Sequence, residues 1–140
     1  MRICESYGRP SWDEWALGIA AAVAKRGDCV RSQVGAIALD EHHIIIGAGY
    51  NGTPSGAPGC LSDGACPRAA SGVEPGSSYD TGPGACIALH AEQNLIRMAD
   101  WRLLIGATLY VTREPCGGCW KLIYGARFRR VVWPGREEIL

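Results

Sequence analysis

The chain has 140 residues, about the size of one ordinary domain, and is too short for two domains that fold independently. Apolar residues make up 47% and charged residues 20%, which argues against disorder. The 14 basic residues equal the 14 acidic residues, so the basic excess typical of proteins that bind long nucleic acids is absent. Because no apolar run suits a membrane span or a signal peptide, we expect a cytoplasmic protein that does not bind membranes.

The first half of the chain predicts one helix and two strands. Residues 11–26 carry apolar side chains three or four positions apart, with Ser11 as N-cap and acidic residues in the first turn, and predict an amphipathic helix. Residues 34–39 and 43–50 are apolar and β-branched, with three polar residues between them. They predict a hairpin whose two strands are buried on both faces.

The second half predicts alternating helices and strands. We expect a helix over about 91–101, a strand over 108–112, a helix over 116–124 with Gly125 as its C-cap, and a strand over 130–133. Strand, helix and strand in this spacing imply a parallel pair with a right-handed crossover. Residues 1–140 are therefore expected to form a single α/β domain, a three-layer α/β/α fold with a central mixed sheet of about five strands.

Residues 51–86 form a segment rich in glycine and proline with no readable periodicity. So long a loop is uncommon in a compact domain unless it is functional, disordered or held by cross-links. Three of the seven cysteines, Cys60, Cys66 and Cys86, lie in it, and cysteines of a reducing compartment more often bind metals or act in catalysis than form disulfides. The segment is therefore predicted to be an insert held by its cysteines.

A short set of residues carries the chemistry: His90 and Glu92, followed by Pro115, Cys116 and Cys119. They match the zinc-deaminase signature H-x-E…P-C-x-x-C. Cys116 and Cys119 are three positions apart at the start of a helix, about 60° apart around its axis, so both sulfurs can reach one ion. His90 and Glu92 would point about 200° apart within a regular helix, so His90 must lie at the helix entrance.

Three protein ligands leave the fourth position of a tetrahedral zinc ion open, which is typical of a catalytic site. Zinc lowers the pKa of a water molecule in that position to about 7, and Glu92 would then carry protons between this water, the substrate ring and the departing amine. A lone C-x-x-C is often a structural or redox pair, so a zinc-binding module without catalysis is the alternative. Glu92 argues against it, because a structural site needs no glutamate there.

Five segments resemble the cytidine deaminase superfamily, and within it the deoxycytidylate (dCMP) deaminases; they are residues 29–39, 47–56, 89–96, 107–119 and 125–133. The zinc motif identifies only the superfamily, whereas GYNGTP followed by a cysteine-rich insert points to dCMP deaminases. The resemblance implies hydrolytic deamination of dCMP to dUMP and ammonia. Alternative substrates are a nucleoside, a 5-modified dCMP or a nucleoside antibiotic. A polynucleotide-editing enzyme is disfavoured by the zero net charge.

The resemblance also implies substrate-binding residues. Asn51 would bind the sugar or the base, with Thr53 beside it, and the backbone of Ala36 would contact the base. By pattern alone, Asn51 and Gly52 form an ordinary turn, and Ala36 is an ordinary core residue. A monophosphate needs one or two cations, for which the candidates are Arg26 and Arg31, then Lys25 and Arg113; a solvated surface charge is the alternative for each.

Some relatives hold a closed structural zinc, and the resemblance places its ligands here at Cys29, Cys60, Cys66 and Cys86. Such a site would order a segment that cannot build its own core. The alternative is four free thiols, and Cys4 is left over in either case. The resemblance further implies a homo-oligomer, a hexamer or a dimer, with dCTP and dTTP together with Mg²⁺ as allosteric effectors.

Overall fold

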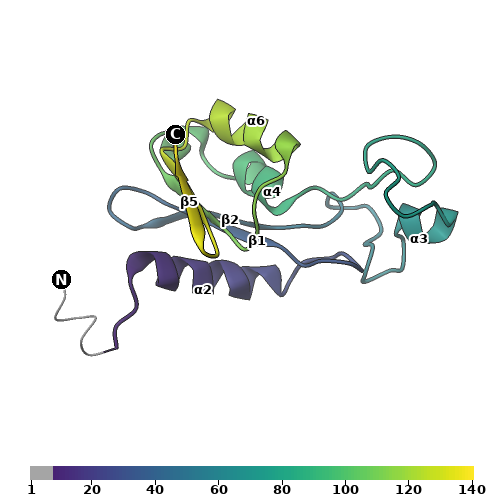
Figure 1. Cartoon of the computed structure of the whole chain (residues 1–140), viewed down its shortest axis with the longest axis horizontal. Helices are drawn as coiled ribbons and strands as arrows, with labels where there is room; N and C mark the ends of the chain where they lie inside the picture. Colours follow the sequence, from purple (N-terminus) through teal and green to yellow (C-terminus); the bar gives the residue numbers. More distant parts are fainter. Residues whose placement is uncertain (1–7) are drawn as a thin grey trace.

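The computed structural model describes residues 8–140, so Cys4 lies outside the described residues. Its strands form one mixed sheet in the order β2-β1-β3-β4-β5 (Figure 1). β3 and β4 pair in parallel, and the other neighbours pair antiparallel. This confirms the predicted mixed sheet and its parallel pair. The strands are β1 (Gly35–Leu39), β2 (Ile45–Tyr50), β3 (Thr108–Val111), β4 (Arg130–Trp133) and β5 (Arg136–Ile139).

Helices cover both faces of the sheet and complete the expected three layers. Figure 1 shows α2 against one face and α4 and α6 against the other. The parallel strands β3 and β4 are joined through α6, as the spacing predicted. The helices are α2 (Trp12–Ala24), α3 (Pro67–Ser71), α4 (Ala91–Met98), α5 (Trp101–Leu104) and α6 (Gly117–Ala126).

The strand β1 organises the core because all five of its residues are buried. Side chains alternate between the two faces of a strand, so Ile37 and Leu39 pack with α2 while Ala36 and Ala38 pack with α4 and α6. The helix α2 approaches β1 so closely at Gly35 that a Cβ there would collide with the backbone of Ala20 and Ala24. That is a physical reason for glycine at the start of β1.

The predicted burial of both hairpin strands is wrong for β2. Only Gly49 of this strand is buried, because β2 is the edge strand and α2 packs mainly against β1. The strand also begins at Ile45, two residues later than predicted. The Asp40 carboxylate accepts hydrogen bonds from the amides of His42 and Ile44, which holds residues 40–44 in a turn.

Further features of the second half of the chain differ from the prediction. The helix predicted over 91–101 stops at Met98, and Asp100 caps a separate helix, α5. The C-cap of α6 is not Gly125 but Arg127, whose φ of 65° turns the chain so that Phe128 enters the core. The strand β5 follows a two-residue Pro-Gly turn after Trp133 and was in none of the predicted ranges.

The insert leaves the sheet and returns to it at one place. Gly52 and Leu89 exchange both of their backbone hydrogen bonds, at 3.0 and 2.8 Å, and so close the base of the insert. Beyond this bridge the insert carries the short helix α3 and extends past one end of the sheet (Figure 1). Within residues 8–140, no helix has the length and apolar character needed to cross a membrane. A single domain over residues 1–140 stays a prediction.

Candidate active site

His90 lies at the entrance of α4, as its spacing from Glu92 required. It is the N-cap, with extended dihedrals of φ −74° and ψ 161°, whereas Glu92 lies within the first turn. The side chain of Gln93 accepts a hydrogen bond of 2.7 Å from the His90 amide and holds this residue outside the regular helix. His90 and Glu92 can therefore serve the same site although they are only two positions apart.

Cys116 has the same position on α6 that His90 has on α4. It is the N-cap, with φ −74° and ψ 169°, so the helix begins one residue later than predicted. Its sulfur accepts a hydrogen bond of 3.4 Å from the amide of Cys119, the third residue of the helix. Pro115 precedes the cap, and the positive end of the helix dipole favours thiolates at both positions.

The structure brings His90, Cys116 and Cys119 together. The Nδ1 atom of His90 lies 3.2 Å from Sγ of Cys119 and 3.4 Å from Sγ of Cys116, and the three ligand atoms lie within 4.8 Å of one another. In the described part of the chain, no other group of three metal-ligating side chains is so close. Both cysteines are free thiols, and one imidazole with two sulfurs is a donor set that suits a catalytic zinc ion.

Glu92 lies in the wall of this cluster. Its side chain is only 3% exposed. Burial raises the pKa of the Cys119 thiol, and the hydrogen bond to Glu92 and the charge of Glu92 raise it further, which places the carboxyl group beside this sulfur. His90 and Cys116 are exposed and Cys119 is buried, so the cluster has one face open to solvent. A substrate can enter from that face while Glu92 stays out of bulk water.

Two contacts that the sequence analysis did not identify fix α4 against β2. A Cβ on Gly49 would lie 2.5 Å from the carbonyl oxygen of Ala91, so only glycine permits this approach. The side-chain amide of Asn94 donates a hydrogen bond of 2.8 Å to the carbonyl of Tyr50. Glycines at alternate positions of a predicted strand were the signal for the first contact. The second contact has no local signal.

Asn51 lies directly after β2 and ties two loops together. Its side chain donates a hydrogen bond of 2.8 Å to the carbonyl of Ser32 and accepts one of 2.9 Å from the amide of Val34. The hydroxyl of Ser32 in turn accepts a hydrogen bond of 3.4 Å from Arg113, three residues before Cys116. The loop 28–34 therefore connects Asn51 to the chain that enters the metal cluster.

The other predicted substrate residues fall into separate places. Arg26 and Thr53 line one groove of about 430 Å³, together with Lys25 and Tyr50, whereas Arg31 and Asn51 are not part of its lining. The Arg26 guanidinium lies 5.8 Å from the centre of the Tyr50 ring. Ala36 is fully buried in the core between β2 and β3, so its side chain contacts only protein.

The four cysteines predicted to form a second site are neighbours but are not gathered at ligand distance. Cys60 and Cys66 are buried, while Cys29 and Cys86 are partly buried. Burial raises the pKa of the Cys60 thiol to about 11, and the charges of the other three thiols contribute. No three of the four have their sulfurs within 4.8 Å of one another.

Residues 10–134 match the family described as "Cytidine and deoxycytidylate deaminase zinc-binding region", and the chain belongs to this family. It is 52% identical over 127 residues to the deoxycytidylate deaminase of Mycobacterium phage D29, covering 90% of this chain and 96% of that protein. It is 38% identical over 126 residues to the deoxycytidylate deaminase of Schizosaccharomyces pombe, covering 89% of this chain and 37% of that protein. The dCMP deaminase of cyanophage S-TIM5, solved in complex with dCMP and dUMP, superimposes with a TM-score of 0.60 at 26% identity, covering 86% of this chain and 78% of that one.

Proposed function

We propose that the protein catalyses the zinc-dependent hydrolytic deamination of dCMP to dUMP and ammonia. The observation that carries the proposal is the cluster of His90, Cys116 and Cys119 with the buried Glu92 beside Cys119. A purely structural zinc site has no use for a buried carboxyl group next to an open coordination position. The similarity to proteins named deoxycytidylate deaminase supports the choice of substrate.

In this mechanism each residue has one task. His90, Cys116 and Cys119 would hold the zinc ion, which supplies, when bound, a Lewis acid that makes a water molecule acidic enough to attack at neutral pH. Glu92 accepts a proton from the attacking water and passes it to the ring nitrogen beside C4 of the cytosine. Glu92 then carries the remaining proton of this water from the new C4 hydroxyl group to the amine. One water is consumed, the C–N bond breaks, and ammonia leaves a carbonyl group behind.

The nucleotide is proposed to lie between the cluster and the turn at Asn51. The neighbouring bridge between Gly52 and Leu89 places this turn beside the residue that precedes His90. Asn51 would contact the sugar or base with Thr53 near it, the Ala36 backbone would lie below the base, and Arg26 or Arg31 would bind the phosphate. Of these two arginines, Arg31 belongs to the loop that contacts Arg113 through Ser32.

A spectrophotometric screen of the purified zinc-loaded protein tests the proposal. The substrates are dCMP, CMP, deoxycytidine and a 5-substituted dCMP, and we expect the highest kcat/KM with dCMP. A site that binds phosphate with charged donors loses about 10- to 150-fold when the phosphate is missing, because the donors are left unpaired. Equal kcat/KM for dCMP and deoxycytidine would instead favour a nucleoside or antibiotic deaminase, and no turnover at all would favour a non-catalytic zinc module.

We also propose a second, structural zinc held by Cys29, Cys60, Cys66 and Cys86. The chemistry of the donor set fits a closed structural zinc, and the other three thiols lie near enough for their charges to raise the pKa of Cys60. Elemental analysis should give two zinc ions per chain, falling to one when Cys60 and Cys66 are both replaced by serine. One zinc ion in both proteins would remove this site.

The family resemblance supports three further proposals. The chain would form a homo-oligomer, a hexamer or a dimer, because the edge strand β2 leaves Ile45 and Tyr50 exposed. dCTP and dTTP with Mg²⁺ would act as effectors, and the protein would work in the cytoplasm. Light scattering measures the oligomeric state. Activity against dCMP at several concentrations of each triphosphate, with and without Mg²⁺, shows whether the effectors act.

A further inference from the structure

Tyr79, an exposed residue of the insert, contacts two arginines on different sides. The guanidinium carbon of Arg68 lies 3.9 Å from the centre of its ring. The phenol oxygen accepts a hydrogen bond of 3.4 Å from Nη1 of Arg31, which is 48 positions away along the chain. Tyr79 is therefore a direct side-chain link between the insert and the loop 28–34.

The insert holds Tyr79 firmly at the Arg68 side. Nη1 of Arg68 donates hydrogen bonds to the carbonyls of Ser78 and Gly84, at 2.8 and 3.4 Å, which fixes the guanidinium plane against the ring. The Tyr79 carbonyl accepts a hydrogen bond of 2.7 Å from the Cys86 amide. Although the Tyr79 ring is exposed, neighbouring residues hold the backbone of Tyr79 and one face of its ring. A fixed ring can orient the group that binds its hydroxyl.

Arg31 keeps its positive charge available for an anion. None of the ion pairs in the described part of the chain includes this arginine, and its hydrogen-bond partner is a neutral phenol. Arg31 is exposed, and the next residue, Ser32, contacts both Asn51 and Arg113. An arginine held by a neutral acceptor retains donors for the bidentate binding that phosphate oxygens favour.

We propose that Tyr79 is a positioning residue that aims Arg31 at the 5′-phosphate, so that the insert sets the preference for a nucleotide over a nucleoside. This inference rests on the proposed function, in which the substrate is dCMP. Tyr79 does not touch the substrate and takes no part in proton transfer. Its hydroxyl restricts the rotamers of Arg31, which lowers the entropy lost when the guanidinium binds phosphate.

The role of Tyr79 predicts a particular kinetic pattern. A prepositioned cation binds the phosphate equally well in the substrate and in the transition state, so removing it raises KM and leaves kcat nearly unchanged. The effect is limited to substrates that carry a phosphate. If Tyr79 served only to pack the insert, a disruptive substitution would lower kcat/KM for dCMP and deoxycytidine alike. Tyr79→Phe, which keeps the packing, would then leave kcat/KM for dCMP unchanged.

The experiment compares Tyr79→Phe, Arg31→Ala and the double variant with the unchanged zinc-loaded enzyme. Phenylalanine keeps the contact with Arg68 and removes only the hydroxyl. Tyr79→Phe should lower kcat/KM for dCMP about 3- to 10-fold through KM and leave deoxycytidine unchanged. Arg31→Ala should have a larger effect of the same kind, and adding Tyr79→Phe to it should change nothing more. Tyr124→Phe, at an exposed tyrosine of α6, is the matched control and should behave like the unchanged enzyme.

The outcomes separate this inference from the function on which it rests. If the unchanged enzyme does not prefer dCMP over deoxycytidine, the proposed function fails first. If it prefers dCMP but Tyr79→Phe is normal, loses activity equally with both substrates, or adds fully to Arg31→Ala, the positioning role is overturned while the deaminase survives. Zinc content measured in every variant shows whether a loss came from the metal instead.

Discussion

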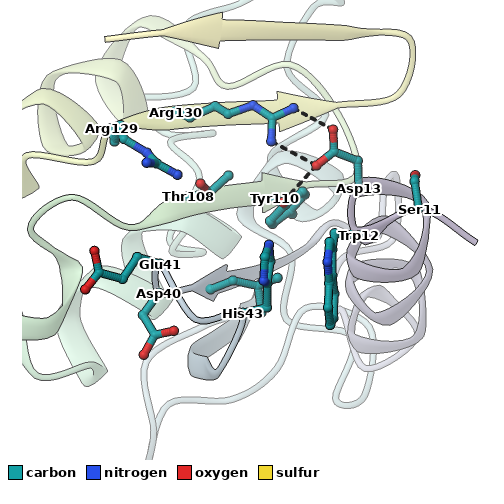
Figure 2. Close-up of a pocket in the computed structure, with 11 residues that line it drawn as sticks. Ser11, Trp12, Asp13, Asp40, Glu41, His43, Thr108, Tyr110, Arg129 and Arg130 are labelled. Carbon is teal, nitrogen blue, oxygen red and sulfur yellow. Dashed lines mark hydrogen bonds and ion pairs between the residues drawn. The ribbon is translucent and has the colours of Figure 1, made fainter. Parts of the chain in front are cut away.

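The polar side chains at the two ends of the sheet are arranged in opposite ways. At the end where β1 finishes and β3 starts, charged groups satisfy one another across four elements. Arg130 binds Asp13, and the Tyr110 hydroxyl donates a hydrogen bond of 2.8 Å to the same carboxylate (Figure 2). Arg130 also binds Glu137. Asp13, Tyr110 and Arg130 border a pocket of about 270 Å³, together with the stacked rings of Trp12 and His43.

At the opposite end, the polar side chains converge on one point. The ligand atoms of His90, Cys116 and Cys119 lie within 4.8 Å of one another and can all offer lone pairs to one cation, which would stabilise the group when bound. The backbone there is packed so tightly that Gly49 admits no Cβ. The Asp13 end of the sheet thus contributes to stability by itself. The end with the metal-ligating cluster keeps an arrangement that is useful only with a metal and a substrate.

The largest expected effect separates chemistry from stability at the metal end. Glu92→Gln removes the proton carrier but keeps the size of the side chain, so turnover should fall by roughly 10²–10⁴-fold or more. Zinc content and melting temperature should stay near those of the unchanged protein. Stopped-flow or spectrophotometric rates with dCMP measure the effect, and near-normal activity would refute the role of Glu92.

The next substitution should lower both the stability of the fold and the turnover. In Gly49→Ala the new methyl group would push α4 away from β2, and with α4 move His90 and Glu92. We expect a loss of about 1–3 kcal/mol in the free energy of unfolding together with a large fall in kcat. Urea unfolding and steady-state kinetics measure the two. Gly125→Ala is the control, because nothing lies within 4 Å of a Cβ there, and it should be neutral or slightly stabilising.

A change at the Asp13 end of the sheet should affect stability alone. Asp13→Asn leaves Arg130 with Glu137 only and weakens the hydrogen bond from Tyr110. The Asp13 carboxylate is partly exposed, so solvent screens its ion pair. We expect a loss of about 1–2 kcal/mol in the free energy of unfolding, with kcat/KM for dCMP unchanged. Glu14→Gln, in the same helical turn, is the control for the helix dipole. A loss of activity in Asp13→Asn that its stability does not explain would show that the two ends are coupled.

The smallest effect concerns pH. The hydrogen bond from Arg130 holds the pKa of the Asp13 carboxyl group below its ordinary value of 3.8. A lowered pKa in the folded state means that this group stabilises the fold above about pH 4, and that the contribution is lost as the pH falls through the lowered value. The difference in melting temperature between the unchanged protein and Asp13→Asn should therefore shrink below about pH 4. A difference that stays constant from pH 6 to pH 2 would contradict this account.

The sequence alone was sufficient where the signal is local. His90 and Glu92 form one short motif and Cys116 and Cys119 another, and in each case the helix entrance that the spacing required is present. The parallel pair of β3 and β4 also follows from adjacent elements. The strand β5 could not be recognised by its pattern, because all four residues are exposed and show no apolar alternation.

Contacts between distant segments left no trace in the sequence. Arg31 and Tyr79 are 48 positions apart, and Tyr79 lies in a segment without periodicity. Family resemblance predicts a substrate role for Asn51, but the hydrogen bonds of its side chain to Ser32 and Val34 depend on how the loop 28–34 folds back on β2. The roles of Asn51, Thr53, Ala36, Arg26 and Arg31 toward the substrate stay predictions.

The bridge between Gly52 and Leu89 makes the insert a module. Two backbone hydrogen bonds close its base and hold residues 52 and 89 together. The entropy of closing a loop grows only slowly with its length, so the sheet should tolerate a short Gly-Ser linker in place of residues 53–88. If the insert sets the preference for a nucleotide, as proposed above, such a graft would bind zinc and keep the fold while losing that preference, and a different insert on the same base would give a different preference.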